Sequence, residues 1–458
     1  MYKLIVQKFG GTSAEDAKAM TRAIEIVRRT GITRRTRTLV VLSACAGVTN
    51  ALIRIGELSL KEDLREAFAA IDQLEARHAR IARDLIENSA LLSSTHGGLH
   101  AIWEELRMLV RGVNLLRELT PRSRDQFSSV GERCSTLIFH AALSERLKRS
   151  AIPVHYYDAR EFFVTDREFL AARPLLPEIV RRMKKIRNAL SNGAVGVTQG
   201  FIGATLLGEV TTIGRGGSDF SAAIQGVAMG AGEIQIWTDV AGIMTCDPRI
   251  APAAQTIERI SFSDASELAF FGAKVLHPET IWPAVEKGIP VRVLSSKEPD
   301  KTGTVILGTV ESDRPITGIA TRRDVVIAKV TSRSTQPDAS VQQAVWDAFA
   351  EHNTVPLAVS LSVDSALYVL DNAKLAAGLR GAFDSIAHVD ILTGRALITL
   401  VGTGLKSHAG IAARIFKVLG RTNCEMVSYG GSETAVSFVI MEEVVNRIVK
   451  RLHREFFE

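Results

Sequence analysis

A lysine followed closely by two adjacent glycines stands at the end of the first predicted strand. The strand covers Leu4–Phe9 and includes Lys8. Gly10 and Gly11 come next, and glycines let a backbone approach an anion closely and expose N–H groups to it. Ser13 can cap the helix that follows, and a helix N-terminus beside a lysine is typical of a phosphate site. The stretch lacks the long loop of a Walker motif and the third glycine of a dinucleotide fingerprint. Taken alone, it is therefore explained equally well by a structural turn.

Three further segments carry cations and glycines of the same kind. A second turn, Gly214–Asp219, places Arg215 before two glycines at the start of a predicted helix. A strand that ends at Trp237 opens into a loop with two carboxylates and Arg249. A helix that stops shortly before Lys274 presents a further cation. Two glycine turns with separate cations favour a polyanionic ligand more strongly than either turn alone.

The bulk composition limits the class of protein. The chain has 458 residues with 46% hydrophobic and 23% charged residues, typical of a soluble globular protein of about two to four domains. Its four cysteines lack metal-ligand spacing, which favours a reducing cytosol and argues against a disulfide scaffold or a zinc site. We find no signal peptide, no membrane-spanning apolar run and no basic stripe interleaved with aromatic residues. We therefore expect a cytoplasmic protein without membrane or nucleic-acid partners, and the net charge of +6 favours anionic ligands.

Strand and helix patterns alternate through the first part of the chain. This alternation predicts an α/β fold with a mostly parallel sheet covered by helices. A helical segment at about residues 57–120 interrupts it as a hairpin, with its turn expected at Ser93–Gly98 and with His78 as a packed core residue. The predicted strands are Leu4–Phe9, Thr38–Ser43, Pro153–Tyr157, Val195–Phe201, Glu233–Trp237 and Pro290–Leu294, and the predicted helices are Asp16–Arg29, Pro177–Leu190, Phe220–Met229 and Glu279–Lys287.

The pattern changes near residue 310, where a β-α-β-β order begins and then repeats. We expect a catalytic domain at 1–310, followed by ferredoxin-like (βαββαβ) domains at 311–390 and 391–458. The predicted strands are Val325–Thr331, Ala358–Ser362, Ala366–Leu370, Leu397–Val401, Glu425–Ser428 and Ala435–Ile440, and the predicted helices are Ser340–Glu351, Ala373–Asp384, Ala409–Leu419 and Glu443–Phe456.

Taken together, these motifs resemble the aspartate kinase (aspartokinase) family, and especially its longer monofunctional members with C-terminal tandem ACT domains. Each motif alone is modest, but the ordered set is specific and covers almost the whole chain. The resemblance implies an amino-acid-kinase-type sheet sandwiched by helices and two ferredoxin-like ACT domains. The matching stretches are Lys8–Ser13, Leu42–Asn50, Ser129–Ser135, Gln199–Gly203, Gly214–Asp219, Thr238–Asp239 with Asp247–Arg249, and Phe271–Pro278.

The resemblance implies transfer of the ATP γ-phosphoryl group to the side-chain carboxylate of L-aspartate. The product would be 4-phospho-L-aspartate, the first step of lysine, threonine and methionine biosynthesis, with Mg²⁺ bound to ATP. An aspartate side chain has a pKa near ~3.9, so the nucleophile is already an anion at neutral pH and needs no general base. The catalyst must instead bring two anions together, which requires cations, N–H donors and positioning.

Site roles follow from the resemblance, residue by residue. Arg215 would hold the α-carboxylate of aspartate with its guanidinium, and Glu132 would pair with the α-ammonium. Asp219 would organise Lys8 or the metal rather than act as a base, and no protein metal ligand is assigned. The expected catalytic residues are Lys8, Arg215 and Asp219; the substrate-binding residues are Ser43, Thr49, Glu132, Phe201 and Arg215; the ATP-binding residues are Lys8, Gly10, Gly11, Thr238, Asp239, Met244, Arg249 and Lys274.

The chain departs from the family pattern in two regions. Met244 replaces a usual tyrosine and Cys246 a usual threonine, which predicts an altered nucleotide contact rather than lost activity. In the first ACT copy, the stretches Gln336–Ser340 and Thr354–Ser360 differ from lysine-sensitive members, so lysine sensitivity stays open. We expect an amino-acid effector at the ACT domains and a homodimer or higher homo-oligomer.

Two other functions fit the same fold. One is a non-catalytic amino-acid-sensing scaffold, and the other is a kinase that acts on glutamate or N-acetylglutamate. The joint presence of the expected cations and carboxylates favours an active kinase over a scaffold. The ACT pair and the Glu132–Arg215 combination suit a free amino acid and favour aspartate.

Overall fold

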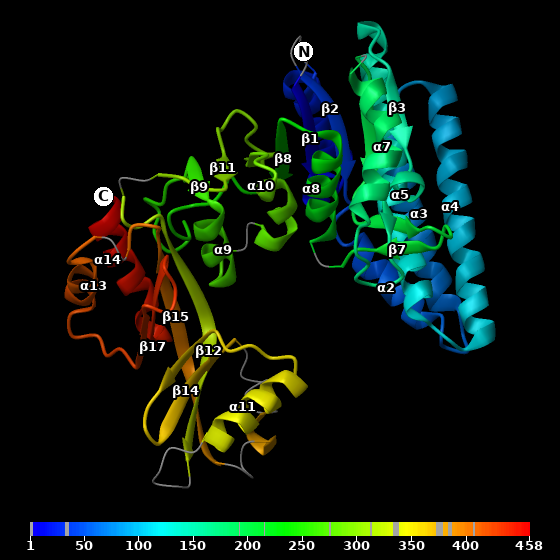
Figure 1. The fold of residues 1–458 in the computed structure, drawn as a ribbon. Helices are drawn as coiled ribbons and strands as arrows, with labels where there is room; N and C mark the ends of the chain where they lie inside the picture. Colours follow the sequence, from blue (N-terminus) through cyan, green and yellow to red (C-terminus); the bar gives the residue numbers. More distant parts are fainter. Residues whose placement is uncertain are drawn as a thin grey trace. The chain divides into compact units, whose positions relative to one another are not determined.

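The computed structural model describes residues 3–32, 36–191, 193–214, 216–273, 276–311, 314–332, 339–371, 379–382, 387–405 and 408–458. The chain forms two compact units, which are described separately below (Figure 1). The first unit comprises Met1–Gly242 and His277–Gly308, and the second comprises Ile243–Leu276 and Thr309–Glu458. No helix in the described ranges is long and apolar enough to cross a membrane.

The first unit is built on a mostly parallel sheet in the order β3-β5-β2-β1-β8-β10-β11. All neighbouring strands in this order are parallel except β10 and β11. The central strands are buried on both faces, as expected for a sheet that is covered on both sides. The strands are β1 (Lys3–Phe9), β2 (Thr36–Leu42), β3 (Val154–Tyr157), β5 (Val195–Gln199), β8 (Glu233–Thr238), β10 (Val291–Ser295) and β11 (Thr304–Leu307).

Two groups of helices pack around this sheet, which confirms the expected α/β sandwich (Figure 1). Helices α7 and α10 both contact α8, whereas α1 and α2 both contact α5. A small sheet of β4 (Val164–Thr165), β6 (Ile202–Thr205) and β7 (Val210–Thr212) completes the unit. The helices are α1 (Ala17–Ile26), α2 (Val48–Leu58), α5 (Pro121–Leu147), α6 (Ala159–Phe162), α7 (Leu176–Ser191), α8 (Gly217–Met229) and α10 (Trp282–Glu286), with short turns at Gly11–Ser13, Val27–Gly31, Lys148–Ser150 and Pro278–Thr280.

The helical hairpin consists of α3 (Arg65–Leu85) and α4 (Ser89–Leu116). The turn expected at Ser93–Gly98 is wrong, because these residues lie inside α4 and Asn88 caps that helix through the Leu91 N–H. Gly98 has a packing role instead: a Cβ there would lie 2.8 Å from Leu137 Cδ2 on α5. The glycine pair marks a close helix contact, which local turn propensity cannot distinguish from a turn.

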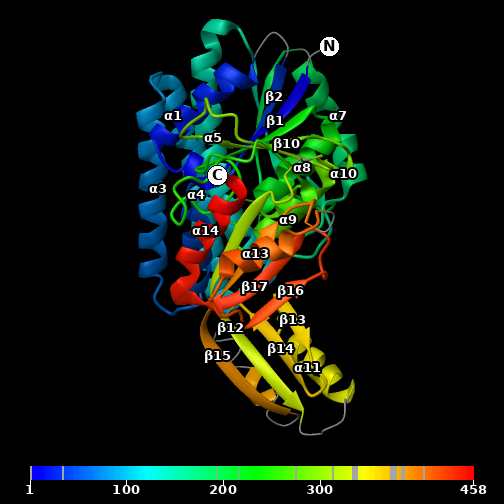
Figure 2. The ribbon, with the colours of Figure 1, turned by 90° about the vertical axis from the view of Figure 1, so that its left-hand side faces the viewer.

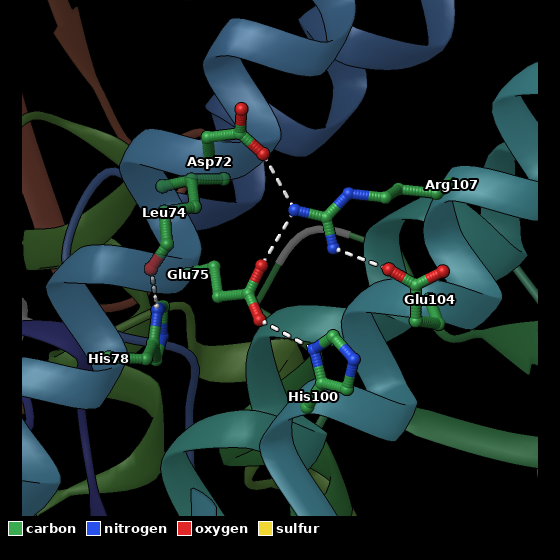
Figure 3. A network of polar contacts seen from close by, with 7 residues as sticks. All are labelled: Asp72, Leu74, Glu75, His78, His100, Glu104 and Arg107. Carbon is green, nitrogen blue, oxygen red and sulfur yellow. Dashed lines mark hydrogen bonds and ion pairs between the residues drawn. The ribbon is translucent and has the colours of Figure 1, made fainter.

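Polar contacts join the two helices of the hairpin (Figure 3). Arg107 on α4 contacts Asp72 and Glu75 on α3, each at 2.6 Å. His78 is fully buried as expected, and its Nδ1 lies 2.7 Å from the Leu74 carbonyl oxygen. Burial lowers the pKa of His78 to about 4, so the ring is neutral at physiological pH. Its interpretation as a packed core histidine is confirmed.

The second unit contains a six-stranded antiparallel sheet in the order β13-β14-β12-β15-β17-β16. Its two central strands, β12 (Gly318–Ser332) and β15 (Ala387–Val401), run side by side along their length (Figure 2). The other elements are β9 (Arg259–Ser261), α9 (Phe262–Phe270), α11 (Ala339–Glu351), β13 (Ala358–Leu361), β14 (Ser365–Leu370), α13 (Ile411–Leu419), β16 (Met426–Tyr429), β17 (Ala435–Met441), a short turn at Glu442–Val444 and α14 (Val445–Phe457).

The two central strands are shared between two ferredoxin-like modules. In the first module, residues 325–332 of β12 lie between the first half of β15 and β14. In the second module, residues 318–322 of β12 pair with residues 397–401 of β15, and these in turn pair with β17. Irregular pairing between Arg322 and Val325 separates the halves. Residues 318–322, which form an edge strand of the second module, therefore precede the first module in the sequence. β15 crosses the domain limit expected at residue 390, and the limits at 310 and 390 stay predictions. The helix predicted at Ala373–Asp384 lies largely outside the described residues.

Candidate active site

The carboxyl ends of three neighbouring strands form one edge of the first unit's sheet. Phe9 at the end of β1 is aligned with Leu42 on β2 and with Trp237 on β8. The loops that follow are joined there: the Gly10 N–H donates to the Trp237 carbonyl oxygen and the Ser43 N–H donates to the Phe9 carbonyl oxygen, both at 3.2 Å. Ligands of open α/β sheets bind beyond this kind of edge.

A cavity of about 370 Å³ lies at this edge and collects side chains from distant parts of the sequence. They come from β1, the loop after β2, helices α2 and α5, the turn after β5 and the start of α8. Its lining includes the predicted site residues Lys8, Gly11, Ser43, Thr49, Glu132, Phe201 and Asp219.

Lys8 and Asp219 form an ion pair in the cavity wall. The distance from Lys8 Nζ to Asp219 Oδ1 is 2.7 Å, and the two side chains are 10% and 17% exposed. Asp219 lies in the first turn of α8, which begins after Gly216 in a left-handed conformation with φ of 73°. The pair is consistent with the expectation that Asp219 orients Lys8.

Glu132 is a third ionisable residue of the cavity, beside Lys8 and Asp219, and it is only 3% exposed. Burial raises its pKa to about 8, and a hydrogen bond from the Ala44 backbone acts against that shift. No described group forms a hydrogen bond with Glu132 Oε2. Helix α5 holds the neighbouring loop, since Ser135 Oγ donates to the Ser43 carbonyl oxygen at 2.8 Å. The cavity therefore contains a buried carboxyl group that is able to accept a donor from a ligand.

Small residues and one strained residue shape the remaining wall. A Cβ added at Gly217 would lie 2.7 Å from Phe201 Cδ2, and one at Gly216 would lie 2.7 Å from Thr280 Cγ2. Phe201 has φ of 64°, which is rare for a residue with a side chain, and its N–H donates to Ser221 Oγ at 2.8 Å. Close packing at both positions and the positive φ of Gly216 therefore account for these glycines without any ligand.

The predicted nucleotide residues are only partly described. Thr238 and Asp239 lie at the end of β8, where the Ser296 N–H donates to the Thr238 carbonyl oxygen, and they do not line the cavity. Met244 and Arg249 belong to the second unit, where Arg249 is 88% exposed on its side chain and pairs with Asp247. Arg215 and Lys274 lie outside the described residues, so their roles stay predictions.

Sequence reasoning gave no role to Asn50, Ser218 or Cys45, which also line the cavity. All three lie in sequence motifs close to residues that were predicted to belong to the site. That proximity is the signal by which they could have been predicted. Burial raises the pKa of the Cys45 thiol to about 12, so it is unreactive and acts as packing. Within the described ranges, no group of three or more His, Cys, Asp or Glu residues is arranged to hold a metal ion.

Comparison with known proteins gives the family. The model of the amino acid kinase family matches residues 3–295, and a model of the ACT domain matches residues 398–456. The chain therefore belongs to the amino acid kinase family.

Close relatives narrow this assignment. Lysine-sensitive aspartokinase 3 of Escherichia coli (strain K12) is 34% identical over 472 residues, with 100% of both chains covered. Aspartokinase 1, chloroplastic, of Arabidopsis thaliana is 34% identical over 474 residues, covering 99% of this chain and 80% of that protein. Within the family, this chain is an aspartate kinase that uses ATP.

Solved structures agree with the assignment. E. coli aspartokinase III in complex with aspartate and ADP (R-state) has a TM-score of 0.80 at 33% identity, with 100% of both chains covered. The same enzyme in complex with lysine and aspartate (T-state) has a TM-score of 0.86 at 32% identity, covering 99% of this chain and 100% of that one.

Proposed function

We propose that the cavity of the first unit binds L-aspartate, with its α-ammonium at Glu132 and its α-carboxylate at Arg215. The observation that carries this proposal is the buried Glu132 carboxyl group, whose Oε2 has no hydrogen-bond partner in the described part of the chain. A buried carboxylate is costly unless it is paired, and an ammonium group would supply the missing donor. The E. coli relative whose structure contains aspartate and ADP supports this choice of ligand.

Lys8 would then act at the point where the two anions meet. The side-chain carboxylate oxygen of aspartate attacks the γ-phosphorus, and the bond from that phosphorus to the β,γ-bridging oxygen breaks, which leaves ADP. Asp219 holds the Lys8 ammonium in the wall at 2.7 Å, so that it can neutralise the transferring phosphoryl group. Gly10 and Gly11 would bring backbone N–H groups to the ATP phosphates.

A Mg²⁺ ion would bind mainly to the ATP phosphates and would neutralise part of their charge. Such ions take one or two protein carboxylates and keep several waters. Asp219 and Asp239, both near the carboxyl edge of the sheet, are of a type that fits this need. We assign neither residue as a ligand, and the steps above do not depend on the ion.

The proposal predicts that Glu132→Gln raises the KM for aspartate by roughly 10- to 100-fold, because a charge-assisted hydrogen bond to the ammonium is lost. The KM for ATP should change little. The measurement is a coupled ADP-release assay with aspartate, and with glutamate and N-acetylglutamate as alternative acceptors. The exposed Glu118→Gln is the matched control and should behave like the unmodified enzyme. An unchanged aspartate KM in Glu132→Gln would exclude the proposed role of Glu132.

We further infer that the C-terminal modules bind an amino-acid effector and that the enzyme is a homo-oligomer. Support comes from the ACT domain match and from the relative solved in complex with lysine and aspartate. Most of the Gln336–Ser340 segment, which departs from lysine-sensitive members, lies outside the described residues.

A further inference from the structure

The second unit contains a cavity of about 320 Å³ that shares no lining residue with the substrate cavity. It lies among the segment 255–261, the start of α9, the residues before β12 and the end of α14. Its volume falls at the small end of the range for sites that bind small molecules.

Asp264 is the buried charged residue of this cavity. It lies at the start of α9 and is 2% exposed. Its Oδ2 accepts a hydrogen bond from Thr317 Oγ1 at 2.7 Å, whereas Oδ1 has no hydrogen-bond partner among the described residues. Burial raises the pKa of Asp264, although Thr317, Ser261 and the Thr403 backbone lie close enough to act against that shift. A buried carboxyl oxygen without a donor is costly, and a ligand with an N–H group would remove that cost.

A cation stands at the same cavity. Arg259 lines it, is exposed, and forms no ion pair or hydrogen bond with any described residue. Arg314 also contributes to the lining. A guanidinium group presents paired donors that match a carboxylate. The cavity thus offers an acceptor in its buried part and a carboxylate-binding group at its exposed part.

Another part of the cavity wall, at Thr245 and Gln255, is held by hydrogen bonds. The Thr245 N–H donates to the Gln255 carbonyl oxygen at 2.8 Å, and the Gln255 N–H donates to Thr245 Oγ1 at 3.0 Å. The buried His453 on α14 lies 3.0 Å from Thr245 Oγ1 through its Nε2. Because these hydrogen bonds already fix the wall, a ligand that binds there would lose little entropy through ordering of the protein.

We propose that this cavity binds a small α-amino acid, with its ammonium at Asp264 Oδ1 and its carboxylate at Arg259. A divalent cation fits less well, because Asp264 is buried while the second carboxylate of the lining, Glu258, is exposed, and two carboxylates on their own supply few of the ligands that such an ion takes. An inorganic anion would place its charge beside Asp264 without a donor for Oδ1. A zwitterion satisfies both groups at once. This site would be additional to the substrate site and lies in the part of the chain that also carries the second ferredoxin-like module.

The test is isothermal titration calorimetry on the full-length enzyme, with each proteinogenic L-α-amino acid other than L-aspartate as the probe. We expect at least one probe to bind, and expect Arg259→Ala and Asp264→Asn each to weaken that binding by tenfold or more. The matched control is Arg447→Ala, an exposed arginine on α14 outside the cavity, which should bind like the unmodified enzyme. The same probe should also bind Glu132→Gln unchanged, which separates this site from the substrate cavity.

Three results would overturn the proposal. The first is that no probe binds at about 10 mM, a concentration that detects even millimolar affinities. The second is that every probe that binds has the same affinity in Arg259→Ala and Asp264→Asn as in the unmodified enzyme. The third is that binding is weakened in only one of these two variants for every probe. If Asp264→Asn fails to fold because Thr317 loses its partner, Arg259→Ala still decides, since Arg259 is exposed and holds no other group.

Discussion

At the scale of single residues, the cavity of the first unit contains two buried ionisable groups in opposite situations. Lys8 has a carboxylate partner at 2.7 Å, whereas Glu132 Oε2 has none within the described ranges. A paired cation can stay charged while it contacts a second anion, and an unpaired buried carboxyl group favours a ligand that brings a cation. In the proposed function, Lys8 would neutralise charge on the phosphoryl group and Glu132 would recognise the substrate.

Lys8→Ala should lower kcat by roughly 10²- to 10³-fold, the usual loss when one group that stabilises transition-state charge is removed. The KM for aspartate should change far less, because Lys8 is proposed to act on the transferring phosphoryl group. Steady-state kinetics with aspartate and ATP varied separately gives both values. Lys18→Ala, which removes an exposed lysine on α1, is the control. A raised aspartate KM with unchanged kcat would contradict this role.

Glu132 should also make stability depend on pH. Its pKa is about 8 in the folded protein against an ordinary value of 4.5, so the folded state binds the extra proton between these pH values. Stability should then fall as pH rises from about 4.5 to 8, by an amount on the order of 4 kcal/mol. The Glu132→Gln variant lacks the group that causes this loss. In denaturant unfolding, its free energy of unfolding should therefore be higher than that of the unmodified enzyme at pH 8 and similar at pH 5. If the variant and the unmodified enzyme had equal free energies of unfolding at both pH values, the result would contradict the burial of an uncompensated carboxylate.

At the scale of elements, helix α4 shows how one signal can have two causes. Gly97 and Gly98 stand together inside the helix, but their surroundings differ. A Cβ at Gly97 would meet no atom within 4 Å, whereas one at Gly98 would approach Leu137. The adjacent glycines suggested a turn, and only the packing of α4 on α5 explains why the second one is needed.

Gly97→Ala should stabilise the protein by about 0.5–1 kcal/mol, the gain in helix propensity over glycine. Gly98→Ala should lose that gain or reverse it, because Leu137 must move to make room. Chemical denaturation of both variants, which serve as matched controls for each other, measures the difference. Equal stabilisation by both substitutions would show that the contact between α4 and Leu137 imposes no constraint.

Two strands of the second unit, β12 and β15, were predicted too short. Residues 318–324 and 387–396 carry polar and charged side chains, which local patterns do not favour as strand. They form strand because β12 and β15 pair with each other along their length. Repeat recognition found the two modules, but it could not show that they share these strands.

At the scale of the whole molecule, we propose that regulation depends on the C-terminal modules, one of which matches the ACT domain. The first module departs from lysine-sensitive members in sequence, while the E. coli relative is named lysine-sensitive. We expect lysine to inhibit this enzyme more weakly than it inhibits that relative. The ADP-release assay with lysine, threonine and methionine, at aspartate concentrations near KM, tests this for both enzymes. Equal lysine inhibition would show that the replaced stretches do not determine the effector.

The sequence by itself determined the alternation of strands and helices, the burial of His78 and the set of groups suited to phosphoryl transfer. These features depend on local propensity, on the spacing of apolar residues and on ordered motifs. Only the tertiary structure decided that Lys8 pairs with Asp219, that Glu132 is buried without a partner for Oε2, and that β12 and β15 are shared by two modules. These contacts join residues far apart in the chain, and they follow from strand order and side-chain packing, which no local stretch of sequence specifies.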